Sequence, residues 1–220
     1  MTERIALIHA TSVAIAPIED AFASLWPEAQ RMNLLEDSLA VDRAKSTDIT
    51  PELTERFVAL SRYAKMAGAT GVLYTCSAFG PAIEEARKIV DLPTLKPNEA
   101  MFGEALAIGG RIGLLATFQP AIGPMRDELE QMAAAMGKQV EIEARFVPDA
   151  LDALQKRKDG DTHDRLIADA AGQFSGIDVL LLAQFSMARA RAATASMVSI
   201  PVLSSPDSAV HAIRRAVTRT

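Results

Sequence analysis

Residues 71–81 read Gly71-Val72-Leu73-Tyr74-Thr75-Cys76-Ser77-Ala78-Phe79-Gly80-Pro81. Four residues typical of a buried strand lead into small polar residues, and Pro81 suits the first turn of a helix. A strand followed at once by a helix is the building unit of parallel α/β sheets. Cys76, the only cysteine of the chain, directly follows the predicted strand. It therefore lies at the carboxyl edge of the predicted sheet, where open α/β folds bind ligands.

The same alternation of short β-type runs and longer helical patterns continues from end to end. We expect strands at 4–9, 31–35, 71–75, 93–95, 111–116, 140–146, 179–183 and 201–203. We expect helices at 14–26, 51–67, 81–90, 99–108, 121–136, 164–174 and 208–217. Nearly continuous apolar strands separated by helices predict an α/β protein whose parallel sheet is covered on both sides.

A weak internal similarity bears on the number of lobes. Residues 71–77 resemble residues 178–184, and a helix-like stretch and a proline-led strand follow each of them. Two βαβ units of the same type are sufficient to explain the similarity. The alternative is that the chain forms two similar lobes whose strand ends face each other across a cleft.

Composition excludes several classes of function. The chain has 220 residues, 49% of them apolar, and a formal net charge of −5. Without a basic stripe to neutralise phosphates, nucleic acid is not an expected partner. A single cysteine leaves no intramolecular disulfide, which is typical of the reducing cytoplasm. We find no signal-peptide pattern and no apolar run long enough to span a membrane, so we expect a cytoplasmic protein without a membrane partner.

Small polar residues follow several of the predicted strands. They are Thr11 and Ser12, Thr75 and Ser77, Thr117 beside Phe118, Gln184-Phe185-Ser186, and Ser204 with Ser205. Hydroxyls and backbone amides at such positions bind a carboxylate without a buried cation. The alternative is that they cap the helices that follow.

Titratable residues near strand ends are the further candidates. Nearby helix amides would favour the thiolate of Cys76, although most free cysteines are small buried apolar residues. His9 ends the first strand and is a candidate for lining the cleft. Lys96 and Glu99 lie where a strand ends and a helix starts, so one of them has a cleft role or the two form a surface pair. A cationic cleft that contains Lys96 or Arg43 would indicate a dicarboxylate.

The other two histidines, His163 and His211, are expected at the surface. None of the three histidines shows metal-ligand spacing with carboxylates or with the cysteine, so we expect no metal site.

Two motifs give the chain a resemblance to a known family. Thr75-Cys76-Ser77-Ala78 and residues 179–187 resemble the two catalytic cysteine motifs of the aspartate/glutamate/hydantoin racemase superfamily, whose relatives include maleate isomerase and arylmalonate decarboxylase. The resemblance implies two flavodoxin-like lobes, each a parallel sheet flanked by helices, with the active site in the cleft between them. The lobes would comprise residues 1–97 plus 205–220 and residues 98–204. The family uses no pyridoxal phosphate and no metal.

At the second motif, Gln184 stands where the family has its second cysteine. An amide cannot exchange a proton at neutral pH, but it can donate a hydrogen bond to a carboxylate or an enediolate. A racemase or epimerase would then need His9, Lys96 or Glu99 as a second acid/base. The alternatives are a single-cysteine decarboxylase or lyase acting on a malonate-like acid, and a non-catalytic protein that binds small carboxylates.

The commoner chemistry of the family favours a cofactor-independent racemase or isomerase. It would act at the α-carbon of a small carboxylate, amino-acid-like or hydantoin-like, through the Cys76 thiolate. Carboxylate contacts are expected from Thr11, Ser12, Ser77, Ala78, Gln184, Phe185 and Ser186, with Thr75, Thr117 and Phe118 as supporting contacts. The substrate and the oligomeric state stay open, with a homo-oligomer as one alternative.

Overall fold

The computed structural model describes residues 2–46 and 48–218, and it contains two parallel four-stranded sheets. The first sheet has the order β2-β1-β3-β4 and the second the order β6-β5-β7-β8. The strands of the first sheet are β1 (Arg4–His9), β2 (Gln30–Leu35), β3 (Gly71–Tyr74) and β4 (Thr94–Leu95). Those of the second are β5 (Arg111–Ala116), β6 (Glu141–Phe146), β7 (Val179–Leu182) and β8 (Val202–Ser204).

Helices follow the strands in both halves. The α-helices are α1 (Ile15–Leu25), α2 (Ser38–Ala44), α3 (Pro51–Met66), α4 (Gly80–Val90), α5 (Glu99–Ile108), α6 (Ile122–Ala135), α7 (Ala150–Gln155), α8 (Gly160–Ala171), α9 (Arg191–Ala195) and α10 (Ser205–Thr218). Short 3₁₀ helices at four strand ends are η1 (Ser12–Ala14), η2 (Ser77–Phe79), η3 (Gln119–Ala121) and η4 (Phe185–Ala190). Local sequence signals set several helix starts. For α3, Pro51 is in the first turn and the Thr50 hydroxyl caps the Leu53 N–H.

The two sheets have the same order of strands, so β3 and β7 occupy corresponding places. The predicted α/β fold with two parallel sheets flanked by helices is therefore confirmed. The largest apolar cluster contains side chains of both sheets, such as Ile8, Tyr74, Leu114 and Leu181. The two halves thus share part of their core.

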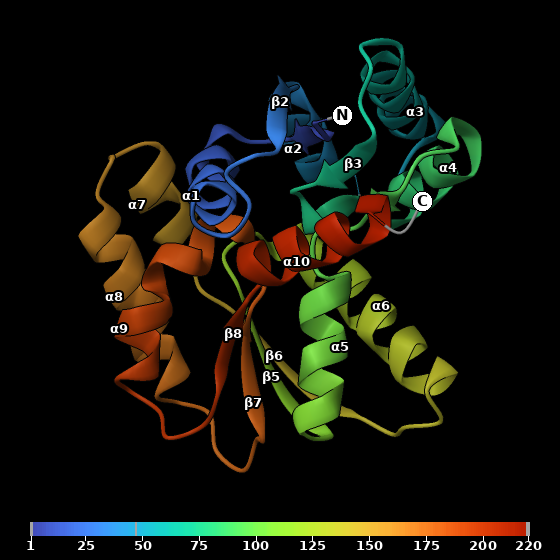
Figure 1. The fold of residues 1–220 in the computed structure, drawn as a ribbon. Coiled ribbons are helices and arrows are strands. Elements are labelled where there is room, and N and C mark those ends of the chain that lie inside the picture. The colour runs from blue at the N-terminus through green and yellow to red at the C-terminus, as the bar shows by residue number, and fades with distance from the viewer. Residues whose placement is uncertain (1, 47, 219–220) are drawn as a thin grey trace.

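Helix α10 returns to the first sheet although it follows the last strand of the second. Figure 1 shows it in red, running across the middle of the molecule between the two halves. It packs against α1 and β3. We keep the division into residues 1–97 plus 205–220 and residues 98–204 as a proposal; residues 1, 47, 219 and 220 lie outside the described part of the chain.

The packing of α10 on β3 predicts a strong effect of one added methyl group. A Cβ at Gly71 would lie 2.7 Å from Val217 Cγ1 and 3.1 Å from Ile213 Cδ1. We expect Gly71→Ala to lower the free energy of unfolding by about 1–3 kcal/mol through overpacking. Gly103→Ala in α5 is the matched control, because nothing lies within 4 Å of its Cβ. Urea unfolding should show the control unchanged or stabilised by up to about 1 kcal/mol, and equal effects of the two changes would contradict this packing.

Three short helices, α2, α7 and α9, were not among the expected elements, because runs of five to seven residues are too short to show a helical period. Helix α8 begins at Gly160, earlier than the predicted residue 164, since the Asp159 carboxylate caps the Thr162 N–H.

The earlier start of α8 places His163 on the inner face of this helix. His163 is fully buried, so its predicted surface position is wrong. His211 is exposed, as predicted.

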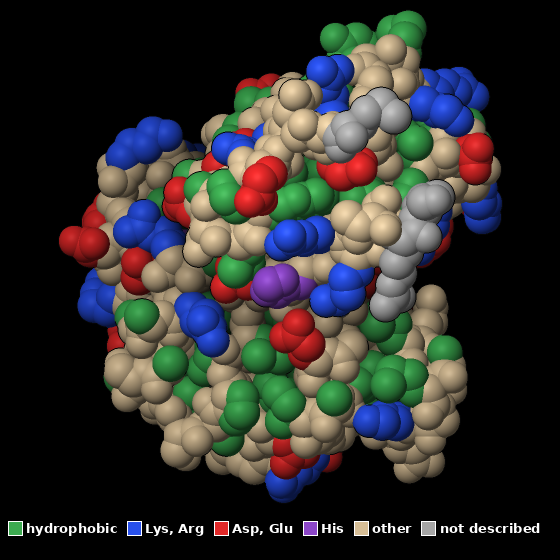
Figure 2. Space-filling model, viewed as in Figure 1, with side chains coloured by type: hydrophobic (Ala, Val, Ile, Leu, Met, Phe, Trp, Pro, Cys, Tyr) green, Lys and Arg blue, Asp and Glu red, His purple; other side chains and the backbone are tan. Residues whose placement is uncertain are grey.

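The surface carries charges of both signs. On the face shown in Figure 2, lysine and arginine side chains are scattered among acidic and apolar ones. Within the described ranges, no helix is both long enough and apolar enough to cross a membrane.

Candidate active site

A cavity of about 870 Å³ lies at the carboxyl ends of strands from both sheets. It brings together nine of the predicted site residues, namely Thr11, Thr75, Cys76, Ser77, Thr117, Phe118, Gln184, Phe185 and Ser186. They follow β1, β3, β5 and β7, the two inner strands of each sheet. The loops meet here because parallel strands end at the same edge of their sheet.

Two predicted contact residues do not line this cavity. Ser12 lines a neighbouring cavity of about 400 Å³. The Ala78 side chain is fully buried, because the turn that begins at Ser77 directs it into the core. The backbone of Ala78 still serves the site, since its N–H donates to the Cys76 thiol.

His9 is fully buried and does not line the cavity. Its ring nitrogens contact Thr75 Oγ1 and Asn33 Oδ1, each at 2.8 Å. The Asn33 amide donates to Glu19 (2.8 Å), which fixes its oxygen toward the imidazole. Hence we assign the proton to His9 Nε2, and Nδ1 accepts from the Thr75 hydroxyl. Burial lowers the pKa of His9, so this residue is a neutral support for Thr75 and its expected place in the cleft is wrong.

Lys96 and Glu99 also lie outside the cavity, in a cluster of charges that joins the two halves. Lys96 Nζ lies 2.7 Å from Glu84 and 3.3 Å from Glu128, while Glu99 pairs with Arg87 at 2.6 Å. The predicted cleft role of Lys96 or Glu99 is therefore wrong: their charges are used in a cluster between α4, α5 and α6. Sequence reasoning missed Glu128, because it lies on a helix about 30 residues further along.

Burial raises the pKa of Glu128 to about 7, with Lys96 acting against the shift. A carboxyl whose pKa is higher in the folded than in the unfolded protein costs stability as pH rises from about 4.5 through 7. Glu128→Gln has no charge to bury, so its stability relative to wild type should increase from pH 5 to pH 8 by about 1–3 kcal/mol. Urea unfolding at both pH values measures this. The exposed Glu130→Gln on the same helix is the control, and a pH-independent effect of Glu128→Gln would contradict the shift.

Cys76 is a half-buried residue that lines the cavity. Burial raises its pKa to about 11, whereas the Ala78 N–H and the Arg43 charge act in the opposite direction. The expected low pKa is therefore wrong. Only the three-residue η2 follows Cys76 directly, and its amides do not outweigh the lost hydration of a thiolate. At neutral pH Cys76 is a protonated thiol.

Gln184 is held in one orientation. Its Oε1 accepts hydrogen bonds from the N–H (2.8 Å) and the hydroxyl (3.2 Å) of Thr117. The amide nitrogen must then point the other way, and it has no hydrogen-bond partner among the residues that the structure describes. A buried N–H₂ group without a partner is costly, which is a reason to expect a ligand oxygen beside it.

Arg43 is a buried residue that sequence reasoning did not place at the site. Its guanidinium donates to the carbonyl oxygens of Ala78 (3.2 Å), Ser46 (2.5 Å) and Pro120 (3.4 Å). Arg43 thereby connects the Cys76 loop with η3 of the other half. It does not line the cavity, so it adds no cation that would indicate a dicarboxylate.

Arg43→Met should raise the pKa of Cys76 further, because it removes the neighbouring positive charge. We expect alkylation by iodoacetamide at pH 8.5 to slow by roughly 3- to 10-fold, while Arg43→Lys stays close to wild type. Because Cys76 is the only cysteine, mass spectrometry reports on this thiol alone. Faster alkylation in Arg43→Met would instead indicate that the loop has opened.

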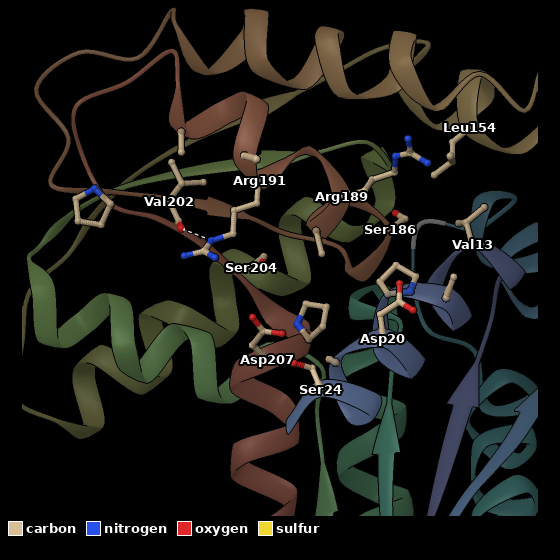
Figure 3. A pocket seen from close by; sticks show the side chains of 18 of the residues that line it. Val13, Asp20, Ser24, Leu154, Ser186, Arg189, Arg191, Val202, Ser204 and Asp207 are labelled. Carbon is tan, nitrogen blue, oxygen red and sulfur yellow. Dashed lines mark hydrogen bonds between the residues drawn. The ribbon is translucent and has the colours of Figure 1, made fainter. Parts of the chain in front are cut away.

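A second cavity, of about 940 Å³, lies beside η4 between α1 and the β8–α10 segment. Figure 3 shows Arg191 donating to the Val202 carbonyl (3.0 Å) in it, and Asp20 and Asp207 also line this cavity. Ser186 lines both cavities. Because Cys76 and Gln184 belong to the first cavity, we take that one as the candidate active site.

Solved structures with a similar fold include racemases and a decarboxylase. A glutamate racemase of Bacillus anthracis is 11% identical with a TM-score of 0.77, over 99% of this chain and 82% of that one. An allantoin racemase of Klebsiella pneumoniae is 16% identical with a TM-score of 0.72, over 99% and 89%. A point variant of arylmalonate decarboxylase is 18% identical with a TM-score of 0.68, over 98% and 93%. The chain therefore has the same two-lobed α/β fold as these proteins.

The chain belongs to the Asp/Glu/hydantoin racemase family, whose model matches residues 9–136. The matched part includes Cys76 and ends before Gln184. A search among curated proteins gives no match.

Proposed function

We propose that this protein is an enzyme that moves a proton at the α-carbon of a small, amino-acid-like or hydantoin-like acid, and that Cys76 carries this proton. Membership of the racemase family supports racemase/isomerase-like activity. The observation that carries the proposal is that Cys76 shares one cavity with Gln184, whose amide nitrogen has no partner in the described part of the chain. A proton carrier and a fixed donor for a negative oxygen are what such chemistry requires.

In the proposed mechanism, the Gln184 amide donates to the substrate carboxylate and to the enediolate formed from it. Thr117 keeps the amide in place through its N–H and hydroxyl. The Cys76 thiolate takes the α-proton, and the C–H electron pair moves into the enediolate. The reaction is completed when a proton returns to the same carbon. The proposal uses no pyridoxal phosphate and no metal.

His9, Lys96 and Glu99 do not line the cavity. None of them is therefore proposed as a second acid/base on the face of the α-carbon opposite Cys76. With one carrier, the proton returns from Cys76 to the face it left, or from water to the other face. We therefore expect exchange of the α-proton with solvent to be faster than loss of optical activity.

One observation favours a second candidate, decarboxylation of a malonate-like acid. The raised pKa of Cys76, about 11, keeps a proton on sulfur at neutral pH. When carbon dioxide leaves, the electron pair of the broken C–C bond forms the enediolate, and the Cys76 thiol then supplies a proton to the α-carbon. This route needs a proton donor and no base.

Proton NMR in deuterium oxide tests both candidates with wild-type protein and a panel of chiral acids, amino acids, hydantoins and malonates. Loss of an α-proton signal would support proton exchange, and polarimetry on the same samples measures racemisation. Loss of carbon dioxide from a malonate would favour the second candidate. Binding of these compounds without any turnover would contradict an enzymatic role and indicate a carboxylate-binding protein.

A further inference from the structure

The cavity that contains Cys76 has two different ends. The predicted site residues in it follow the inner strands β1, β3, β5 and β7, as described above. The elements that follow the outer strands β2 and β6 contribute the polar residues Asp149, Asp152, Gln155 and Lys156 and also a set of apolar residues. The apolar residues are Ala40, Val41 and Ala44 on α2, Phe146 and Pro148 at the end of β6, and Leu151 on α7. Ala40 and Val41 of α2 also line the neighbouring smaller cavity together with Gln155 of α7, so α2 and α7 lie close together, and their apolar residues form one wall of the larger cavity.

Two large apolar side chains in this wall are left exposed. Val41 on the first half is 55% exposed, and Phe146 on the second half is 42% exposed. Single exposed apolar residues are common. Here, however, two of them from separate halves line the same cavity, together with the half-buried Leu151. An apolar group that entered this end would remove both side chains from water.

The charged residues of the cavity do not favour an anionic group at this end. They are Asp149, Asp152 and Lys156, and the one cation, Lys156, pairs with Asp152 at 2.8 Å. Two further cations are bound outside the cavity. Arg43 donates to backbone carbonyls, and Lys96 forms ion pairs with Glu84 and Glu128. A second carboxylate would therefore meet apolar carbon and two acidic side chains.

We propose that the substrate carries an uncharged, bulky apolar substituent, a branched alkyl or aryl group, held between Val41, Phe146 and Leu151. This inference rests on the proposed function, since it assumes that the acid group is bound near Gln184 and Thr117. It makes Val41 and Phe146 specificity-determining residues, while the proton transfer is left to Cys76. Aspartate-like and glutamate-like acids, whose substituent ends in a carboxylate, are poor substrates.

Matched pairs of compounds test the substituent directly. Phenylalanine is compared with aspartate, and 5-benzylhydantoin with hydantoin-5-acetic acid, because each pair replaces a benzyl group by a carboxymethyl group. We expect kcat/KM for α-proton exchange in deuterium oxide to be about 10- to 100-fold higher for the benzyl member. Equal or faster exchange of the carboxymethyl member would overturn the inference while leaving the proposed function standing.

Variants in the apolar wall provide the second test. Phe146→Ala should lower kcat/KM for 5-benzylhydantoin by about 5- to 20-fold and leave kcat/KM for 5-methylhydantoin within about twofold, because a methyl group has little apolar area to bury against the wall. Val41→Lys should narrow the difference between the benzyl and carboxymethyl compounds. Both positions are exposed, so the fold is expected to tolerate the changes. Tyr63→Ala is the matched control, since Tyr63 is a 50% exposed aromatic residue on α3 outside the cavity.

Protection of Cys76 against alkylation separates this inference from the proposed function. The same four compounds are added to wild-type protein with iodoacetamide at pH 8.5, and the modified fraction is measured by mass spectrometry. If no compound undergoes exchange, the proposed function fails. Protection by the benzyl compounds at about tenfold lower concentration than by the carboxymethyl ones would still support the apolar wall. Equal protection, or no protection by the benzyl compounds, would overturn it.

Discussion

Cys76→Ser is expected to lower the rate of α-proton exchange, or of decarboxylation, by at least about 1000-fold. General acid/base groups contribute about 10²- to 10⁴-fold to a rate. A serine hydroxyl is a far weaker acid than a thiol, so it neither donates a proton readily nor forms the anion that would accept one. The rate of α-proton exchange of one substrate is measured by NMR in deuterium oxide for wild type and variant, and the ratio of the two rates gives the effect of the substitution.

The fold should not be affected by this change. Serine replaces sulfur by a smaller oxygen at a partly exposed position, so the thermal unfolding midpoint is expected to stay within a few degrees of wild type. Ser196→Ala on the exposed surface at the end of α9 is a neutral control for expression and handling. A Cys76→Ser protein that keeps full activity would remove Cys76 from the mechanism.

The second large effect is on the pH dependence of proton exchange. With a Cys76 pKa of about 11, the thiolate fraction grows about tenfold for each pH unit below that value. If the thiolate is the base, kcat/KM for α-proton removal should rise roughly 100-fold between pH 7 and pH 9. The measurement requires a substrate without a group that titrates in this range, and circular dichroism to show that the protein stays folded at pH 9.

The same pH profile separates the two proposed activities. In a decarboxylation the thiol acts as the proton donor, and it is protonated throughout this range, so the rate should change little between pH 6 and pH 9. A flat profile for proton exchange would contradict the thiolate as the base. A kcat/KM profile that levels off near pH 7 would indicate that the Cys76 pKa of the free protein lies near that value, whereas levelling off of kcat alone would indicate that substrate binding lowers it.

Much of the fold could be predicted because strands and helices follow from local patterns. The bounds of β1, β5 and α5 agree with the prediction, and β2 extends by one residue beyond the range that we expected. Apolar runs of four to six residues followed by helical periodicity favour buried parallel strands whatever the rest of the chain does. The short helices α2 and α7 are not predicted from the sequence because each has fewer than two turns, and they carry Val41 and Leu151 of the apolar wall.

The candidate site was predicted in part, for a topological reason. Residues that follow inner strands of parallel sheets meet at one edge, so the positions of Cys76, Thr117 and Gln184 could be expected from the chain alone. The direction in which a side chain at a strand end points could not be predicted from the chain alone. His9 is the last residue of β1 and its ring turns toward Thr75 and Asn33, inside the protein.

The sequence by itself determined the order of strands and helices, the position of the single thiol at one strand end and the position of Gln184 at the corresponding strand end of the other half. Only the tertiary structure decided that Cys76 is a protonated thiol, that Lys96 and Glu99 are used in an ion cluster, and that Val41 faces the same cavity as Phe146. Local patterns predict whether a segment forms a helix or a strand, because the period of each element depends only on residues that are close in sequence. Burial, pKa values and the pairing of distant loops depend on which segments pack together, and that contact is made across more than 100 residues of chain.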